Sequence, residues 1–322
     1  MPYEVDHRLM IGVASSALFD LKASGAVFLS EGETAYREYQ RERFDEPLKP
    51  GVAFPFIRRL LSLNDLAENP GSDGRLVEVV VLSHNDPDTG LRVMKSIEHH
   101  KLDISRAVFT QGRSPYRYIP ALAISLFLSA DENDVRSAIG QGHPAGQVLE
   151  SAAVDDPDDP EVRIALDFDG VLVDDESEQV MQNGGLDNFR QHELENLVTP
   201  HSAGPLKEFL LKVYSIQKLE EAKKKADPEY KNRLRVSLVT ARDAPAHERA
   251  VRTLNVWGVL VNDAFFLGGI EKGRILQVLK PHIFFDDQRG HLESTSMHSP
   301  AVHVPFGRLN EESAAAEPAI EG

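Results

Sequence analysis

The chain of 322 residues has no cysteine, which excludes disulfides, thiolate catalysis and cysteine metal sites. Positive charge is also scarce, because 35 Lys and Arg stand against 51 Asp and Glu, for a formal net charge of −16. This balance argues against a general nucleic-acid binder, since phosphate backbones select basic surfaces. It leaves a small phosphorylated substrate open, because a bound metal ion can supply positive charge locally.

Long apolar runs and a recognisable leader are missing too. No apolar run approaches the length that spans a bilayer. The opening residues 1–7 lack the basic, apolar and small-residue pattern of a signal sequence. We therefore expect a cytoplasmic protein without a membrane partner. The length suffices for two domains of ordinary size.

The most informative stretch is residues 163–174, where the apolar run 164–166 ends on Asp167 and Asp169. The pattern predicts a buried strand that delivers both carboxylates to its carboxyl end. Side chains at i and i+2 on an extended backbone point the same way. Burying two carboxylates together is unfavourable unless a cation or a proton lies between them, and Mg²⁺ meets that need. The alternative is a solvated turn with two capping aspartates.

Three further segments place polar residues after an expected strand. The apolar run 234–239 precedes Thr240, a glycine pair precedes Lys272, and the run 283–285 precedes Asp286 and Asp287. The alternation of strands and helices predicts an α/β fold with a largely parallel sheet and helices on both faces. We expect these polar residues to converge with the aspartate pair.

The chain is predicted to divide into domains. Residues 1–154 form the first, the proline- and aspartate-rich residues 155–160 a linker, and residues 161–309 the second. A mainly helical insertion covers about 176–232. Residues 310–322 are acidic and alanine-rich, and we expect them to be disordered.

The two predicted domains resemble each other in sequence. Residues 79–131 align with residues 236–288 without a gap at an offset of 157, and Ile11 falls on Ile164 at an offset of 153. This indicates two copies of one Rossmann-like unit, although any two α/β stretches share part of such a pattern. The first copy lacks the polar set and has these residues at the positions of Asp167, Asp169, Lys272, Asp286 and Asp287: Ala14, Ser16, Pro115, Ser129 and Ala130. The first copy is therefore predicted to be degenerate and catalytically silent.

The four motifs resemble, in order and chemistry, those of the haloacid dehalogenase (HAD) superfamily of phosphotransferases. The flanking segments, residues 46–55, 83–90, 112–117, 174–178 and 281–288, are similar to the cytosolic type I 5′-nucleotidases. The resemblance runs from about residue 8 to 307 and includes the silent copy. It implies a HAD-like Rossmannoid sheet whose cap is the insertion at 176–232.

The resemblance also implies a reaction, the Mg²⁺-dependent hydrolysis of nucleoside 5′-monophosphates, AMP-like and ribo- or deoxyribo-. Asp167 would attack the phosphorus and form an aspartyl phosphate, and Asp169 would act as acid and then base. Asp167, the Asp169 carbonyl and Asp286 would hold Mg²⁺, with Asp287 as a further ligand through water. Thr240 and Lys272 would bind the phosphate.

Other candidate contacts and functions stay open. Arg242 could contact the substrate or form an ion pair within its loop. Glu176 and Glu178 could contact the substrate or begin an exposed helix. His99, His100, His282 and His291 show no metal-ligand pairing. A HAD phosphatase of another small metabolite and a nucleotide-binding regulatory protein without turnover are the alternative functions. Base preference cannot be predicted, and a homo-oligomer and a nucleotide effector remain candidate partners.

Overall fold

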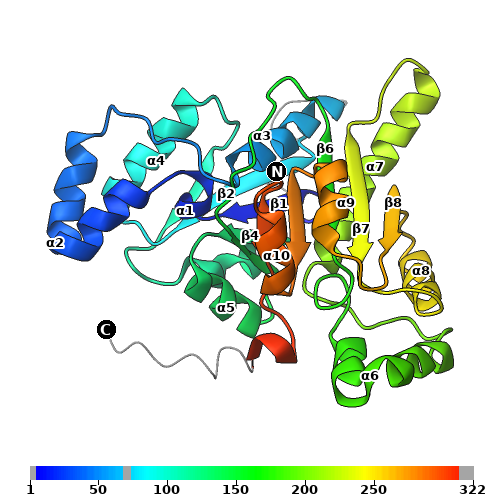
Figure 1. The fold of residues 1–322 in the computed structure, drawn as a ribbon. Coiled ribbons are helices and arrows are strands. Elements are labelled where there is room, and N and C mark those ends of the chain that lie inside the picture. The colour runs from blue at the N-terminus through cyan, green and yellow to red at the C-terminus, as the bar shows by residue number, and fades with distance from the viewer. Residues whose placement is uncertain (1–4, 68–73, 312–322) are drawn as a thin grey trace. The chain divides into compact units, whose positions relative to one another are not determined.

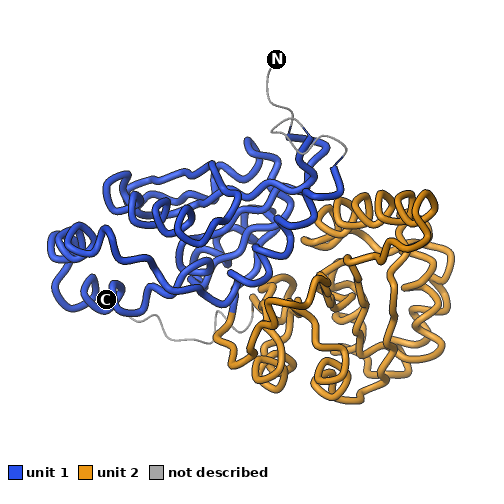
Figure 2. The backbone as a smooth tube through the Cα atoms, turned by 90° about the horizontal axis from the view of Figure 1, so that it is seen from above, with its two compact units in different colours: residues 1–148 blue, residues 149–322 orange. Residues whose placement is uncertain are grey.

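The computed structural model describes residues 5–67 and 74–311. It contains two compact units, residues 1–148 and residues 149–322, which Figure 2 colours separately. Every strand pair within each unit is parallel. The predicted α/β fold with a largely parallel sheet is therefore confirmed.

Unit 1 has the strand order β3-β2-β1-β4-β5. Its β2 has the sequence VEVVVLS and is buried along its whole length, as is usual for a β-branched strand covered on both faces. Its elements are β1 (Leu9–Val13), α1 (Ser15–Leu18), α2 (Lys22–Glu42), α3 (Phe54–Ser62), β2 (Val77–Ser83), α4 (Pro87–His99), β3 (Arg106–Phe109), β4 (Leu126–Ser129), α5 (Glu132–Gly140) and β5 (Ala145–Val148) (Figure 1).

Unit 2 has the strand order β8-β7-β6-β9-β10, which matches unit 1 strand for strand. Its elements are β6 (Val162–Leu166), α6 (Glu176–Glu195), α7 (Lys207–Ala226), β7 (Leu234–Thr240), α8 (His247–Val256), β8 (Asp263–Phe266), α9 (Lys272–Leu279), β9 (Ile283–Asp286), α10 (Arg289–Thr295) and β10 (Ala301–His303).

The sheet of unit 2 is covered on both faces. Phe284 packs in one apolar cluster with Leu276 of α9 and Leu292 of α10. The next residue, Phe285, contacts Phe209 of α7 at 5.8 Å between ring centroids. Because successive side chains of a strand point to opposite faces, these contacts place α9 and α10 on one face and α7 on the other.

The elements of the two units follow the offsets of the sequence repeat. Both ends of β7 lie 157 residues after those of β2, and the same holds for β8 and β3 and for β9 and β4. Both ends of β6 lie 153 residues after those of β1. The helices after these first strands are kinked at equivalent glycines, Gly32 in α2 and Gly185 in α6.

Residues 176–232, predicted as one helical insertion, form two helices with different surroundings. α7 buries Phe209, Leu210 and Val213 and packs against β7, so it belongs to the layer that covers the sheet. α6 lies beyond the carboxyl end of β7 in Figure 1. Of these two helices, α7 is thus part of the sheet-covering layer, and the cap remains a prediction that concerns α6.

The predicted linker and tail differ in part from the structure. Residues 155–160 lie within unit 2, where Asp159 pairs with Arg163 at 2.7 Å and with His282 at 3.4 Å. Asn310, expected to begin a disordered tail, is buried and donates its amide to the carbonyl of Asp287 at 3.0 Å. Residues 312–322 of that tail lie outside the described residues.

None of the helices in the described part of the chain combines the length and apolar character that a bilayer crossing requires.

Candidate active site

The carboxyl ends of β6 and β9 bring Asp167 and Asp286 to one lysine. Lys272 begins α9, and its Nζ lies 2.5 Å from Asp167 Oδ2 and 2.7 Å from Asp286 Oδ2. All three side chains are buried. Asp167 is fixed further because its Oδ1 accepts the Phe168 amide at 2.7 Å and its own amide donates to the Phe285 carbonyl at 2.9 Å. Three predicted site residues thus form one buried ionic cluster.

Burial and charge set the protonation of this cluster. Burial raises the pKa of Asp167 to about 7, although Lys272 lowers it. Burial works against the charge of Asp286 too, but Lys272 and His291 hold the pKa of Asp286 below its ordinary value. Burial alone would lower the pKa of Lys272, and the two carboxylates outweigh it and raise that pKa. Lys272 is therefore charged, and one ammonium balances two aspartates incompletely.

Asp287 adds a third carboxyl to the same place. Its side chain is buried, and burial together with Asp286 and Asp167 raises the pKa of Asp287 well above its ordinary value. Its Oδ1 has no hydrogen-bond partner among the described residues. A Cβ on Gly170 would lie 2.5 Å from Asp287 Oδ2, and Gly170 has φ +70°. The glycine after Asp169 is therefore required for Asp287 to reach the cluster.

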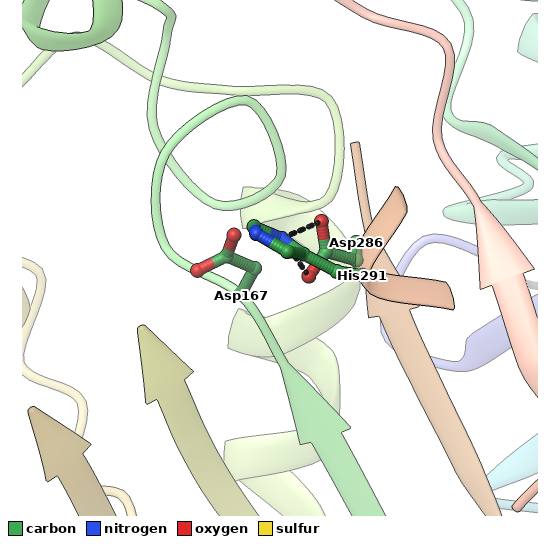
Figure 3. Close-up of side chains that lie close together, drawn as sticks. All are labelled: Asp167, Asp286 and His291. Atoms are coloured by element: carbon green, nitrogen blue, oxygen red, sulfur yellow. Dashed lines mark hydrogen bonds and ion pairs between the residues drawn. The ribbon is translucent and has the colours of Figure 1, made fainter. Parts of the chain in front are cut away.

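His291 belongs to the cluster, although sequence reasoning set it aside. Its Nδ1 lies 3.2 Å from each carboxylate oxygen of Asp286. Figure 3 shows the imidazole beside that carboxylate, with Asp167 nearby. One ligand atom from each of these three residues lies within 4.8 Å of the others. The available signal was its place in α10, the helix that directly follows β9 and Asp287.

The donor set fits a divalent cation. Asp167 and Asp286 offer carboxylate oxygens, which Mg²⁺ prefers, and His291 adds a nitrogen that transition metals accept. The raised pKa of Asp287 and its unpartnered Oδ1 mark a deficit of positive charge at this point. A cation there would stabilise the ionised carboxylates.

A second group of candidate ligands consists of Asp174, Glu176 and His201. Here positive charge is already present, because Glu176 lies 3.5 Å from the Arg249 guanidinium. His201 Nε2 lies 3.3 Å from a Glu193 oxygen. Glu176, predicted to touch substrate or to begin an exposed helix, does begin α6 and is half-exposed.

Asp169 pairs with Arg242. Arg242 Nε lies 2.7 Å from Asp169 Oδ2, and its Nη2 lies 2.6 Å from Asp169 Oδ1. The third nitrogen, Nη1, contacts Glu193 of α6, and Arg242 is 3% exposed. Arg242, predicted as either a substrate contact or a loop ion pair, is in this structure an ion pair with the other aspartate of the motif.

Thr240 and Glu178 flank the cluster. Thr240 ends β7, is buried, and its Oγ1 accepts the Arg242 amide at 3.3 Å. Burial raises the pKa of Glu178, and the charge of Asp169 raises it further, whereas His291 and Lys272 lower it. Glu178 therefore lies within electrostatic reach of the site.

Comparison with known proteins decides the family. A family model described as 5′-nucleotidase matches residues 1–311. The chain belongs to the 5′-nucleotidase family. Human cytosolic 5′-nucleotidase 1B is 34% identical over 294 residues, which cover 91% of this chain and 48% of the human protein. The chain thus spans about half the length of this curated relative of the 5′-nucleotidase family, and no solved structure matches it.

Proposed function

We propose that this member of the 5′-nucleotidase family is a phosphoric monoester hydrolase that removes phosphate from nucleoside 5′-monophosphates, AMP-like and ribo- or deoxyribo-. The observation that carries the proposal is the buried Lys272 ammonium shared by Asp167 and Asp286 at the carboxyl ends of adjacent strands. We propose the cytoplasm as its location, in line with the printed name of the human relative.

Asp167 is the proposed nucleophile. One of its carboxylate oxygens forms a bond to phosphorus while the bond from phosphorus to the ribose 5′ oxygen breaks. Asp169 gives a proton to that departing oxygen, so a neutral nucleoside leaves. A water then attacks the aspartyl phosphate and passes its proton to Asp169. Phosphate is released, and both aspartates return to their starting states.

The surrounding residues are proposed to balance the negative charge of the phosphate and to position the substrate. Lys272 faces the two carboxylates and offsets negative charge when a phosphate arrives. Thr240 offers a hydroxyl to a phosphate oxygen. Asp167, the Asp169 carbonyl, Asp286 and Asp287 would hold Mg²⁺, whose bound charge would neutralise part of the phosphate. We propose that α6 covers the nucleoside and excludes water.

The N-terminal unit is proposed to be catalytically silent. Ala14 stands in it where Asp167 stands in unit 2, and Pro115 stands at the position of Lys272. Ser15 and Ser83 instead hydrogen-bond each other at 2.9 Å near the ends of β1 and β2. This unit therefore lacks the nucleophile and the ammonium that the proposed reaction requires.

The test is phosphate release from a panel of nucleoside monophosphates and sugar phosphates, with Mg²⁺ and with EDTA. We expect Mg²⁺-dependent release, nucleotides preferred, and none from Asp167→Asn. Asp131→Asn is the matched control, because Asp131 also follows a strand end but caps α5 in unit 1. Activity in Asp167→Asn would contradict the assignment of Asp167 as the nucleophile. A preference for sugar phosphates would contradict nucleoside monophosphates as the substrate class.

A further inference from the structure

The side chains of Asp169, Arg242 and Glu193 form a continuous chain from the site to α6. Arg242 donates to both oxygens of Asp169 at 2.6 and 2.7 Å and contacts Glu193 through its third nitrogen. Arg242 and Glu193 are 3% and 1% exposed. Each of the three guanidinium nitrogens thus contacts a protein carboxylate, and the buried group links the two acidic residues directly.

Unit 1 shows which part of this chain the fold itself requires. There Arg92 Nη1 donates to Gln40 Oε1 at 3.0 Å, just as Arg249 Nη1 donates to Glu193 Oε1 at 2.9 Å in unit 2. A neutral amide is therefore enough for this contact. The carboxylate of Glu193 adds a negative charge, and its second oxygen faces Arg242 and His201.

None of the three charged residues is present at the equivalent positions of unit 1. By the offsets of 153 and 157, Asp169, Arg242 and Glu193 correspond to Ser16, Asn85 and Gln40. The backbone elements that carry them are kept in both units. Arg242 and Glu193 therefore occur in the unit that has Asp169, and the equivalent elements of unit 1 form without these charges.

We propose that Arg242 is a positioning residue that fixes the carboxylate of Asp169 for proton transfer, and that Glu193 holds Arg242 in place from α6. The inference rests on the proposed function. A bidentate guanidinium fixes both the place and the plane of a carboxylate. When one oxygen of Asp169 carries the proton, the other still accepts from Arg242, so the residue stays in place through both proton transfers.

The test compares a nucleoside 5′-monophosphate with its analogue that has sulfur in place of the bridging 5′ oxygen. A thiolate leaves without a proton, so the analogue does not need the acid. Arg242→Asn introduces the residue of unit 1, and Arg242→Lys keeps the charge but loses the fork. We expect both variants to lower kcat/KM about 100-fold for the oxygen substrate and only a few-fold for the sulfur analogue.

Three further variants calibrate this result. Asp169→Asn should show the same selective loss, and Glu193→Gln a smaller one. Arg190→Gln is the control, because Arg190 also projects from α6 to pair with Asp243 at 2.6 Å, one residue beyond Arg242, but is 35% exposed. It should keep both rates within about twofold. Unfolding curves of every variant separate these effects from loss of fold.

Equal losses on both substrates, or a higher KM at unchanged kcat, would overturn the positioning role of Arg242. A wild-type protein that hydrolyses neither substrate would instead overturn the proposed function. An Asp169→Asn variant without selective loss would remove the acid that Arg242 is proposed to position.

Discussion

Arg92 and Arg249 occupy equivalent positions in the two units and make the same hydrogen bonds. Their Nε atoms donate to the carbonyls of Glu46 and Thr199 at 3.0 and 2.9 Å. Their own carbonyls accept the hydroxyls of Ser96 and Thr253 at 2.7 and 2.9 Å. A buried scaffold has thus been kept in both halves of the chain, while the residues of the candidate site occur in one.

The two units also have an ion pair between neighbouring strands at equivalent positions, with the acidic and basic residues exchanged. Glu78 on β2 pairs with Arg106 on β3, and Arg235 on β7 pairs with Asp263 on β8. The positions correspond at the offset of 157. What the repeat keeps here is the pairing of opposite charges across two strands, which stabilises the strand register in either orientation.

Thr240 and Ser83 stand at equivalent strand ends and give a direct comparison of the two units. Thr240→Ala should lower kcat/KM for a nucleoside monophosphate by about 100-fold, because one hydrogen-bond donor to the reacting phosphate is lost. Ser83→Ala should leave activity unchanged, since its hydroxyl pairs with Ser15 in the silent unit. Steady-state kinetics on both variants measures this. A comparable loss in Ser83→Ala would contradict the silence of unit 1.

Gly170→Ala should destabilise the protein and remove activity. The added Cβ would lie 2.5 Å from Asp287 Oδ2 at a positive φ, so both strain and a clash act. The control is Gly112→Ala, since Gly112 has φ +79° but open space around its Cβ position. Strain alone should cost Gly112→Ala about 1 kcal/mol. Denaturant unfolding should show a clearly larger loss for Gly170→Ala, and equal losses would contradict the close packing of Asp287.

Lys272→Met should make stability depend more steeply on pH and on metal than in the wild type. Removing the ammonium leaves two buried carboxylates without their partner, at a cost of about 3–5 kcal/mol. Because Lys272 lowers the pKa values of Asp167 and Asp286, its removal makes the folded state bind protons more tightly, and stability should fall more steeply as pH rises than in the wild type. Added Mg²⁺ should restore part of it.

Unfolding at pH 6 and pH 8, with and without MgCl₂, measures this effect. Lys218→Met on the exposed face of α7 is the control and should change stability by less than about 0.5 kcal/mol. A loss in Lys272→Met that is independent of pH and Mg²⁺ would be incompatible with the ionic cluster.

The contribution of Glu193 to stability should decrease as the solution becomes acidic. Burial opposes its charge, but His201 and Arg242 outweigh burial and hold the pKa of Glu193 well below its ordinary value. A carboxyl with a depressed folded-state pKa stabilises fully above its unfolded pKa of about 4.3, and the contribution is lost as pH falls through the folded pKa. The stability difference between wild type and Glu193→Gln should therefore shrink below about pH 4. Urea unfolding from pH 3 to pH 6 tests this, and a constant difference would contradict it.

The strand ends were predictable because each is a local pattern. The apolar run before Asp167 and the run before Asp286 identify buried parallel strands, and such strands end at one edge of a sheet. The apolar run 234–239 likewise predicted β7, and the bounds of β2 and β7 differ by the offset of the sequence repeat.

The contacts between side chains far apart in sequence were not predictable in the same way. Glu193 meets Arg242 across 49 residues, and nothing near either residue indicates the other. His291 turns toward Asp286 because α10 starts directly after β9, a geometry that residue spacing alone does not specify. The sequence also did not show that the two helices of the insertion at 176–232 have different surroundings. Phe209 of α7 is buried because it packs on the sheet, and that contact is not visible in the local sequence.

The most direct test of the central claim is to trap phosphate on the chain. Wild type and Asp169→Asn would be mixed with a nucleoside 5′-monophosphate labelled in its phosphate, quenched in acid, digested and analysed by mass spectrometry. We predict a phosphoryl group on the peptide that contains Asp167. With the analogue that has sulfur at the 5′ position, we predict more of it in Asp169→Asn than in wild type, because the sulfur leaves without an acid and only the second step then lacks Asp169. Rapid phosphate release without label on Asp167, or label on a residue of unit 1, would contradict the account.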